Sequence, residues 1–260
     1  MATDRWTHEQ LLLTFNLYCK IPFGKYHQYN PEVISLANLI GRTPSAVAMK
    51  LANFASLDPQ HHSRGIKGLT NSSKADKEAW DEFTSDWNEF ATESEILLTQ
   101  LAVDEQNQLI LVDTPEEILE AIANRQTEIE RSVKVRMGQS FFRKTVLTSY
   151  HLRCCICGIP IPSLLIASHI IPWKDREDLR LNPYNGLCLC ALHDKAFDMG
   201  LITVDSSYDI LISSKINAYL PNEGLENGFE IYKGKKISLP DKFYPTKEFL
   251  EYHSDSYFKQ

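Results

Sequence analysis

The sequence of 260 residues lacks any apolar run that approaches the ~18–20 residues needed to cross a membrane. The apolar stretch LLLTF near its start has neither a basic leader nor a small-residue cleavage site, so no signal peptide is predicted. Internal repeats and low-complexity tracts are also missing. We therefore expect no membrane partner and a cytoplasmic, globular protein with one large domain or two modest ones.

Lysine and arginine are absent from residues 78 to 124, which carry thirteen Asp and Glu residues. The formal net charge of −7 argues against a nucleic-acid partner, but the rest of the chain has a net charge of +6. Because affinity for nucleic acid depends on local basic patches, the total charge does not exclude such a partner.

The six cysteines are unevenly spread: Cys19 stands alone, and the others form two clusters at residues 154–157 and 188–190. Disulfides are rare in a reducing compartment, so two clusters of soft ligands favour a metal site.

Three short helices are predicted near the start of the chain. The first follows Thr7, the second begins at Pro31 and ends before Gly41, and the third begins after Thr43. A tight turn before the third helix is typical of helix-turn-helix proteins.

The opening Trp6-Thr7-x-Glu9 and the turn LIGRTPSAV resemble the Myb/SANT-like three-helix DNA-binding pattern. The resemblance implies that the third helix is the recognition helix, with Arg42, Ser45 and Lys50 facing DNA. The alternative is a plain helical domain.

The acidic segment is predicted to be mainly helical. One helix is expected over KADKEAWDEFTSDWNEFATESEILLTQL, with four aromatic residues buried on one face. It is followed by a predicted strand over NQLILVD and by a second predicted helix over TPEEILEAIANRQTEIERSV. The basic segment KVRMGQSFFRKTVLTSYHLR is predicted to form a further helix. Strands are predicted at GLITVD, YDILISS and FEIYKGKKISLP, with turns at Ser206-Ser207 and Lys233-Gly234. The segment TKEFLEYHSDSYF is predicted to form a closing helix.

The run from ASHIIPW through NPYNGLCL to LHDKAFD carries the chemistry. His169 lies at the end of an apolar, β-branched segment, and the turn at Asn185-Gly186 precedes a buried strand that leads into a helix. Two strands followed by a helix form a ββα arrangement. At these residues the sequence resembles the HNH nuclease motif on a ββα-metal fold, over a span from Phe142 to Gly200.

The resemblance implies phosphodiester hydrolysis with one divalent metal ion. His169 would be the general base, and Asn185 would either orient that base or fix the loop. The last motif position lies about nine residues after the Asn in this family, which corresponds to Asp194, and a second ligand often follows four residues later, at Asp198. Residues i and i+4 share a helix face, and two carboxylates favour Mg²⁺ or Mn²⁺. Ser168 stands where many relatives have an acidic residue or His, so it is a weak third ligand.

Cys154-x₂-Cys157 and Cys190-x₂-His193 have the spacing of a structural zinc site of three cysteines and one histidine. Adjacent helix residues point about 100° apart, so His193 and Asp194 are not expected to bind the same ion. Either His193 binds zinc, or the cysteines are core residues and His193 itself is a catalytic-metal ligand. In the zinc arrangement Cys155 and Cys188 are core residues.

Basic and polar side chains near the motif either bind phosphates of DNA or form a solvated face. These candidates are Lys134, Arg136, Gln139, Arg143 and Lys174.

The sequence therefore predicts an α+β protein: a helix-turn-helix-like domain over residues 1–75, an acidic helical connector over 76–133 and an HNH nuclease domain over 134–260. The expected activity is metal-dependent DNA cleavage, by analogy in bacterial restriction or phage defence. Double-strand cleavage with a single site needs two copies, so a homodimer is expected. The rival reading is a non-catalytic DNA-binding or regulatory protein that keeps the ββα scaffold.

Overall fold

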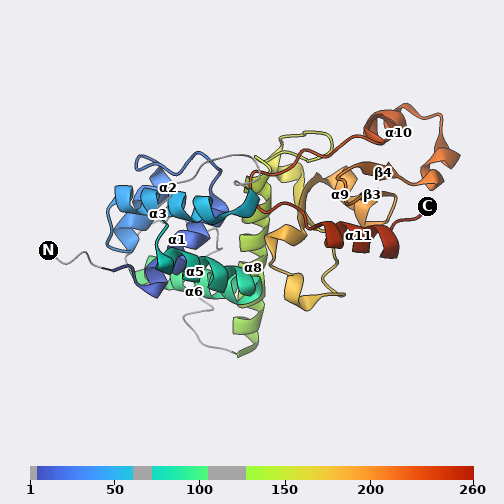
Figure 1. Cartoon of the computed structure of the whole chain (residues 1–260). Helices are drawn as coiled ribbons and strands as arrows, with labels where there is room; N and C mark the ends of the chain where they lie inside the picture. The colour runs from blue at the N-terminus through green and yellow to red at the C-terminus, as the bar shows by residue number, and fades with distance from the viewer. Residues whose placement is uncertain (1–4, 61–71, 105–126) are drawn as a thin grey trace. The chain divides into compact units, whose positions relative to one another are not determined.

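A computed structural model of the chain describes residues 5–60, 72–104 and 127–260. The chain divides into two compact units, residues 1–145 and 146–260, which are described separately below (Figure 1). The first unit continues past residue 133 and includes α5 (Lys74–Ser85) and α6 (Trp87–Asp104), which lie in the segment expected to be an acidic connector.

The first unit begins with the three expected helices, α1 (His8–Lys20), α2 (Pro31–Leu39) and α3 (Pro44–Leu57). Thr7 and Gln10 form a reciprocal capping box that starts α1. Asn30 caps α2 and Thr43 caps α3, each followed by a proline at the first turn. The predicted helix starts are thus confirmed.

The single helix expected over residues 74–101 is wrong: it is two helices, α5 (Lys74–Ser85) and α6 (Trp87–Asp104). Asp86 is extended, and its carboxylate accepts hydrogen bonds from the backbone of Asn88 and Glu89. Aspartate at this position satisfies the first free N–H groups of the second helix, so it begins a helix more readily than it continues one.

An aromatic cluster fills the first unit around Phe15 of α1. The aromatic residues predicted to be buried on α5 and α6 all join it. The ring of Phe15 lies 5.0 to 6.0 Å, centroid to centroid, from those of Tyr18, Phe54, Trp80, Phe83, Trp87 and Phe90.

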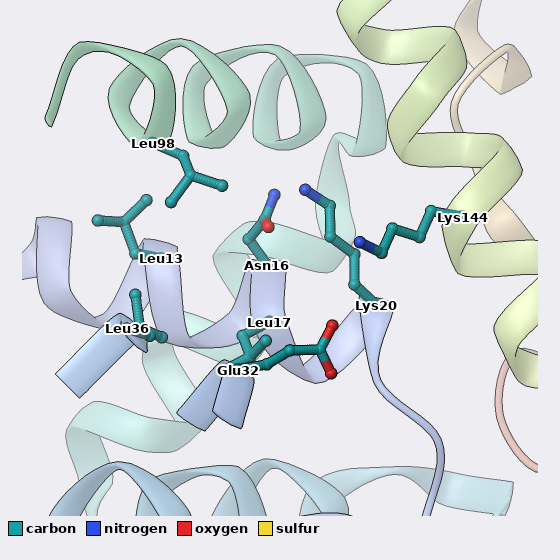
Figure 2. A pocket seen from close by; sticks show the side chains of 8 residues that line it. All are labelled: Leu13, Asn16, Leu17, Lys20, Glu32, Leu36, Leu98 and Lys144. Carbon is teal, nitrogen blue, oxygen red and sulfur yellow. The ribbon is translucent and has the colours of Figure 1, made fainter. Parts of the chain in front are cut away.

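A polar cluster lies beside these rings. Lys20 forms a buried ion pair with Glu95, and the amide of Asn16 donates to Glu95 and to Ser94. Figure 2 shows Asn16 and Lys20 on α1 and Lys144 reaching in from α8 (Thr127–Ser149). The hollow between them is about 10 Å³, which is room for about one water molecule. This cluster is therefore part of the packing of the unit.

The second unit contains the ββα element. Strand β1 (Leu165–His169) pairs antiparallel with β2 (Gly186–Cys190). Helix α9 (Ala191–Asp198), which is labelled in Figure 1, follows β2 directly. A second hairpin, β3 (Ile202–Val204) and β4 (Ile210–Ile212), confirms the strands predicted at GLITVD and YDILISS. The short helices α10 (Glu223–Gly228) and α11 (Lys247–Ser256) follow, and α11 confirms the predicted closing helix.

The strand expected over FEIYKGKKISLP is wrong. Residues Glu230–Tyr232 form a 3₁₀ turn, and only an isolated bridge joins Asp209 to Lys236. The turn predicted at Lys233-Gly234 is confirmed, and Gly234 has the left-handed backbone, with φ of 70°, that such a turn uses.

The predicted α+β class, with a helical N-terminal part and a C-terminal ββα part, is confirmed. The strand expected at NQLILVD and most of the helix expected after it lie outside the described residues. Across the part of the chain that is described, no helix is both long enough and apolar enough to span a membrane.

Candidate functional site

The β1–β2 hairpin and α9 bring together motif residues that are far apart in the sequence. The strand register places His169 opposite Gly186 and Ser168 opposite Leu187. Helix α9 starts immediately after Cys190 and packs against both strands. Its residue Asp194 lies next to the hydroxyl of Ser168 on β1.

His169 is held in place by the loop between the strands. Its Nε2 atom lies 2.8 Å from the carbonyl oxygen of Arg180 and 2.8 Å from Nε1 of Trp173. Burial lowers the pKa of His169, and the carbonyl of Arg180 opposes this effect. The imidazole is therefore neutral at pH 7, which is the form that accepts a proton.

The contact with the carbonyl of Arg180 also influences which ring nitrogen of His169 carries the proton. A carbonyl only accepts hydrogen bonds, so its 2.8 Å contact favours the tautomer with the proton on Nε2. Nδ1 then carries the lone pair of the ring. Trp173 favours the opposite tautomer because its indole N–H is a donor to the same Nε2 atom. Trp173 follows His169 by four residues, but nothing in the sequence pointed to its contact with the imidazole.

Asn185 fixes the loop rather than the base. Its Oδ1 accepts a hydrogen bond of 2.8 Å from the backbone N–H of Ile171, and its Nδ2 donates to the carbonyls of Ile171 and Leu179. The backbone N–H of Ile170 donates to its carbonyl. Because Asn185 is 1% exposed, these bonds satisfy polar groups that have no access to water. Of the two roles considered for Asn185, these contacts support the structural one.

Helix α9 carries two carboxylates, and that of Asp194 lies next to Ser168 of β1. Burial raises the pKa of Asp194, the charge of Asp198 adds to this effect, and the neighbouring hydroxyl of Ser168 opposes it. Burial also raises the pKa of Asp198. The buried Ser168 Oγ makes no hydrogen bond of normal geometry to the described residues. A buried hydroxyl next to the carboxylate of Asp194, which burial makes costly to charge, fits one side of a site for a hard divalent cation.

A second set of ligands lies on the other side of α9. The sulfur of Cys157 is 3.8 Å from that of Cys190, and Nδ1 of His193 is 3.3 Å from the sulfur of Cys190 and 3.5 Å from that of Cys154. All four ligand atoms lie within 4.8 Å of one another. Tetrahedral zinc with ordinary bond lengths places two sulfurs roughly 3.8 Å apart and a sulfur and a nitrogen roughly 3.5 Å apart. The four residues therefore have the donor set and the spacing of a structural zinc site.

Both ring nitrogens of His193 are directed away from the carboxylates. Nδ1 faces the sulfurs, and Nε2 lies 2.8 Å from the carbonyl oxygen of Gly228. This second contact fixes the tautomer that leaves Nδ1 for a metal. It argues against His193 as a ligand of the ion at Asp194. Nothing in the sequence pointed to Gly228, which lies far along the chain.

Cys155 and Cys188 are buried core residues, at 1% and 0% exposure. The backbone N–H of Cys155 donates to the carbonyl of Cys188, which ties the first cysteine loop to β2. The six cysteines are free thiols in the structure.

The candidate DNA-binding residues near the motif are mostly accessible. Lys134, Arg136, Gln139 and Arg143 are exposed on α8, and the last three are spaced three and four residues apart on one face. Lys174 is exposed beside the ring of Tyr257.

The three candidates in the first unit have different surroundings. Ser45 is exposed, whereas Arg42 is half-buried and donates to Gln10 and to the carbonyl of Arg5. Lys50 is 8% exposed and forms a buried ion pair with Asp76, so its expected contact with DNA does not fit its position. Spacing on α3 alone did not reveal the buried Asp76 on α5.

Residues 154–205 match the model of a family described as HNH endonuclease. The matched segment contains both cysteine clusters, the β1–β2 hairpin and α9, so this part of the chain is similar to HNH endonuclease domains. A comparison with curated proteins gave no match.

Proposed function

We propose that the protein is a DNA endonuclease that hydrolyses phosphodiester bonds with one divalent metal ion, Mg²⁺ or Mn²⁺. The observation that carries this proposal is the position of Asp194 beside Ser168 on β1, next to His169 at the strand end, within the segment that matches the HNH family. The bound ion would supply a Lewis acid at the scissile phosphate and at the departing oxygen.

His169 is the proposed general base. It is neutral at pH 7, and the carbonyl of Arg180 orients its ring. With the proton on Nε2, Nδ1 takes a proton from the attacking water. Asp194 and Asp198 would hold the ion, with Ser168 Oγ as a weaker ligand. Asn185 acts indirectly, because it fixes the loop that carries the carbonyl of Arg180.

Zinc is proposed as a second, structural ion at Cys154, Cys157, Cys190 and His193. It would hold the start of α9 against the first cysteine loop, so that Asp194 is presented at a fixed place. Exposed basic residues on α8 and Lys174 are proposed to bind the DNA backbone.

The first unit is proposed to contribute DNA recognition, with Ser45 on the accessible face of α3. A homodimer would explain double-strand cleavage with one site per chain. Bacterial restriction or phage defence, in the cytoplasm, is the proposed setting by analogy with HNH proteins that carry an added recognition domain.

The test is cleavage of supercoiled plasmid DNA in Mg²⁺ or Mn²⁺ by the full chain and by His169→Ala. We expect nicking or linearisation by the wild type and none by the variant, with DNA binding retained. His151→Ala is a matched control, because His151 is an exposed histidine of the same unit that pairs with Asp241. Full activity of His169→Ala contradicts the assignment.

A non-catalytic DNA-binding protein on the same scaffold is the second candidate. It is favoured by one observation: within the described residues, the cysteine–histidine cluster is the only group of three or more Cys, His, Asp or Glu ligand atoms close enough to hold an ion. The site at Asp194 therefore needs water or phosphate to complete its coordination. Absence of any plasmid cleavage by zinc-loaded protein that binds DNA would favour this candidate.

A further inference from the structure

A hollow of about 750 Å³ opens in the second unit just beyond the proposed catalytic helix. It begins at Met199, the residue after Asp198, and includes Leu201. Its volume falls in the range of about 300–1,000 Å³ that small-molecule sites occupy. None of the residues placed above in the catalytic or zinc site lines it.

The hollow combines apolar walls with one accessible aromatic ring. Ile216, Leu225 and Phe229 form part of the walls, and Tyr219 is 74% exposed at its edge. The hydroxyl of Tyr219 makes no hydrogen bond that would hold the ring elsewhere, among the described residues. Asn222 also lines the hollow, and its Oδ1 caps α10, which leaves the amide N–H groups on its accessible side.

The charge of the lining is positive. Lys215 and Lys259 line the hollow, both are exposed, and neither forms an ion pair within the described part of the chain. No Asp or Glu is found among the described lining residues. The hollow is therefore suited to a ligand with a flat apolar part and a negative charge.

The C-terminal end of the chain is held in place at this hollow. The N–H of Lys259 donates to the carbonyl of Gly200, at 2.9 Å. A Cβ atom at Gly200 would lie 2.0 Å from the carbonyl oxygen of Tyr257, so only glycine permits this close approach. Lys259 is thereby brought to the hollow by a backbone contact.

We infer that this hollow binds a nucleotide of the DNA strand next to the cleavage site, with its base against Tyr219 and the apolar walls and its phosphates at Lys215 and Lys259. This inference rests on the proposed function, since it makes the DNA substrate the ligand. Aromatic residues and lysines in one groove are the usual means of binding single-stranded or unstacked nucleotides. Asn222 supplies donors for the edge of the base.

The inference is tested by binding, not by cleavage. The probe is a short fluorescein-labelled oligothymidylate, with the full chain carrying His169→Ala so that the strand stays intact. A matched oligonucleotide with abasic sites in place of the bases keeps the phosphates. We expect Tyr219→Leu to raise the Kd of the base-containing strand about tenfold, the scale of a lost base–aromatic stack, and to leave the abasic strand unaffected. The double variant Lys215→Gln/Lys259→Gln should weaken binding of both strands.

Tyr29→Leu and Lys247→Gln are matched controls, because each replaces an exposed residue of the same type outside the hollow. Retained zinc content and an unchanged circular dichroism spectrum show that the variants fold. Unchanged Kd values in both hollow variants overturn the inference, as does tight binding of an acidic apolar peptide with no binding of the oligonucleotide. If the wild type binds the oligonucleotide at the hollow but never cleaves plasmid, the nuclease proposal fails and the nucleotide site stands.

Discussion

Replacement of Asn185 by alanine should strongly destabilise the second unit. The change leaves the buried N–H of Ile171 without its acceptor and removes two donors, to Ile171 and Leu179. An orphaned buried donor costs about 1–3 kcal/mol, and the carbonyls add less because one contact is long, at 3.3 Å. The expected loss in free energy of unfolding is about 3 kcal/mol.

The assay is a urea titration followed by hydrogen exchange of the peptides that cover β1 and β2, which reports on the second unit alone. Asn182→Ala is the matched control: this side chain accepts one hydrogen bond, from the backbone of Tyr184, so its loss should cost about 1 kcal/mol. DNA cleavage by Asn185→Ala should also fall, because the loop that carries the Arg180 carbonyl loses its anchor. If Asn185→Ala is no less stable than Asn182→Ala, the reasoning from buried hydrogen bonds is wrong.

Three further predictions concern zinc, pH and the first unit. Elemental analysis of the purified protein should find one zinc ion per chain. The Cys157→Ser variant should lose this zinc, whereas the control variant Cys155→Ala should keep it. Equal zinc loss from the two variants would contradict the proposed ligands. Burial lowers the pKa of His253 to about 4, against about 6.5 in an unfolded chain. As the pH falls, the unfolded state therefore binds a proton before the folded state does. The free energy of unfolding should decrease by roughly 3 kcal/mol between about pH 6.5 and about pH 4. Urea midpoints measured across this range should vary less in His253→Gln, and an unchanged pH dependence would refute the role of His253. Asp76→Ala leaves the buried ammonium group of Lys50 without its partner. The free energy of unfolding of the first unit, measured by urea titration, should decrease by about 3–5 kcal/mol. A decrease of less than about 1 kcal/mol would contradict the importance of the buried pair.

The helix starts could be predicted from the sequence because they depend only on neighbouring residues. Thr7, Pro31 and Thr43 mark helix starts by capping and by the geometry of proline, and these depend only on neighbouring residues. The break at Asp86 uses the same chemistry, but the continuous aromatic stripe across it suggested one helix. Periodicity reports which face is buried, and two successive helices can bury one stripe.

Site residues were predicted where the motif itself carries them. The pairing of Cys154 and Cys157 with Cys190 and His193 followed from ligand spacing, and the four ligand atoms do lie together. Contacts between distant segments could not be predicted in this way. The carbonyl of Gly228 at His193 and the carboxylate of Asp76 at Lys50 come from other elements, and one sequence holds no record of such pairings.

The short helix α9 presents the adjacent residues His193 and Asp194 to different surroundings. His193 is 2% exposed and points towards the three sulfurs, whereas Asp194 is half-buried and faces β1. Adjacent residues on a helix point about 100° apart, so one ion cannot use both. A metal at the cysteines would fix the rotation of α9 about its axis, and that rotation decides whether the carboxylate of Asp194 reaches Ser168. Zinc content and cleavage should therefore fall together in Cys157→Ser, even though Cys157 takes no part in the proposed chemistry.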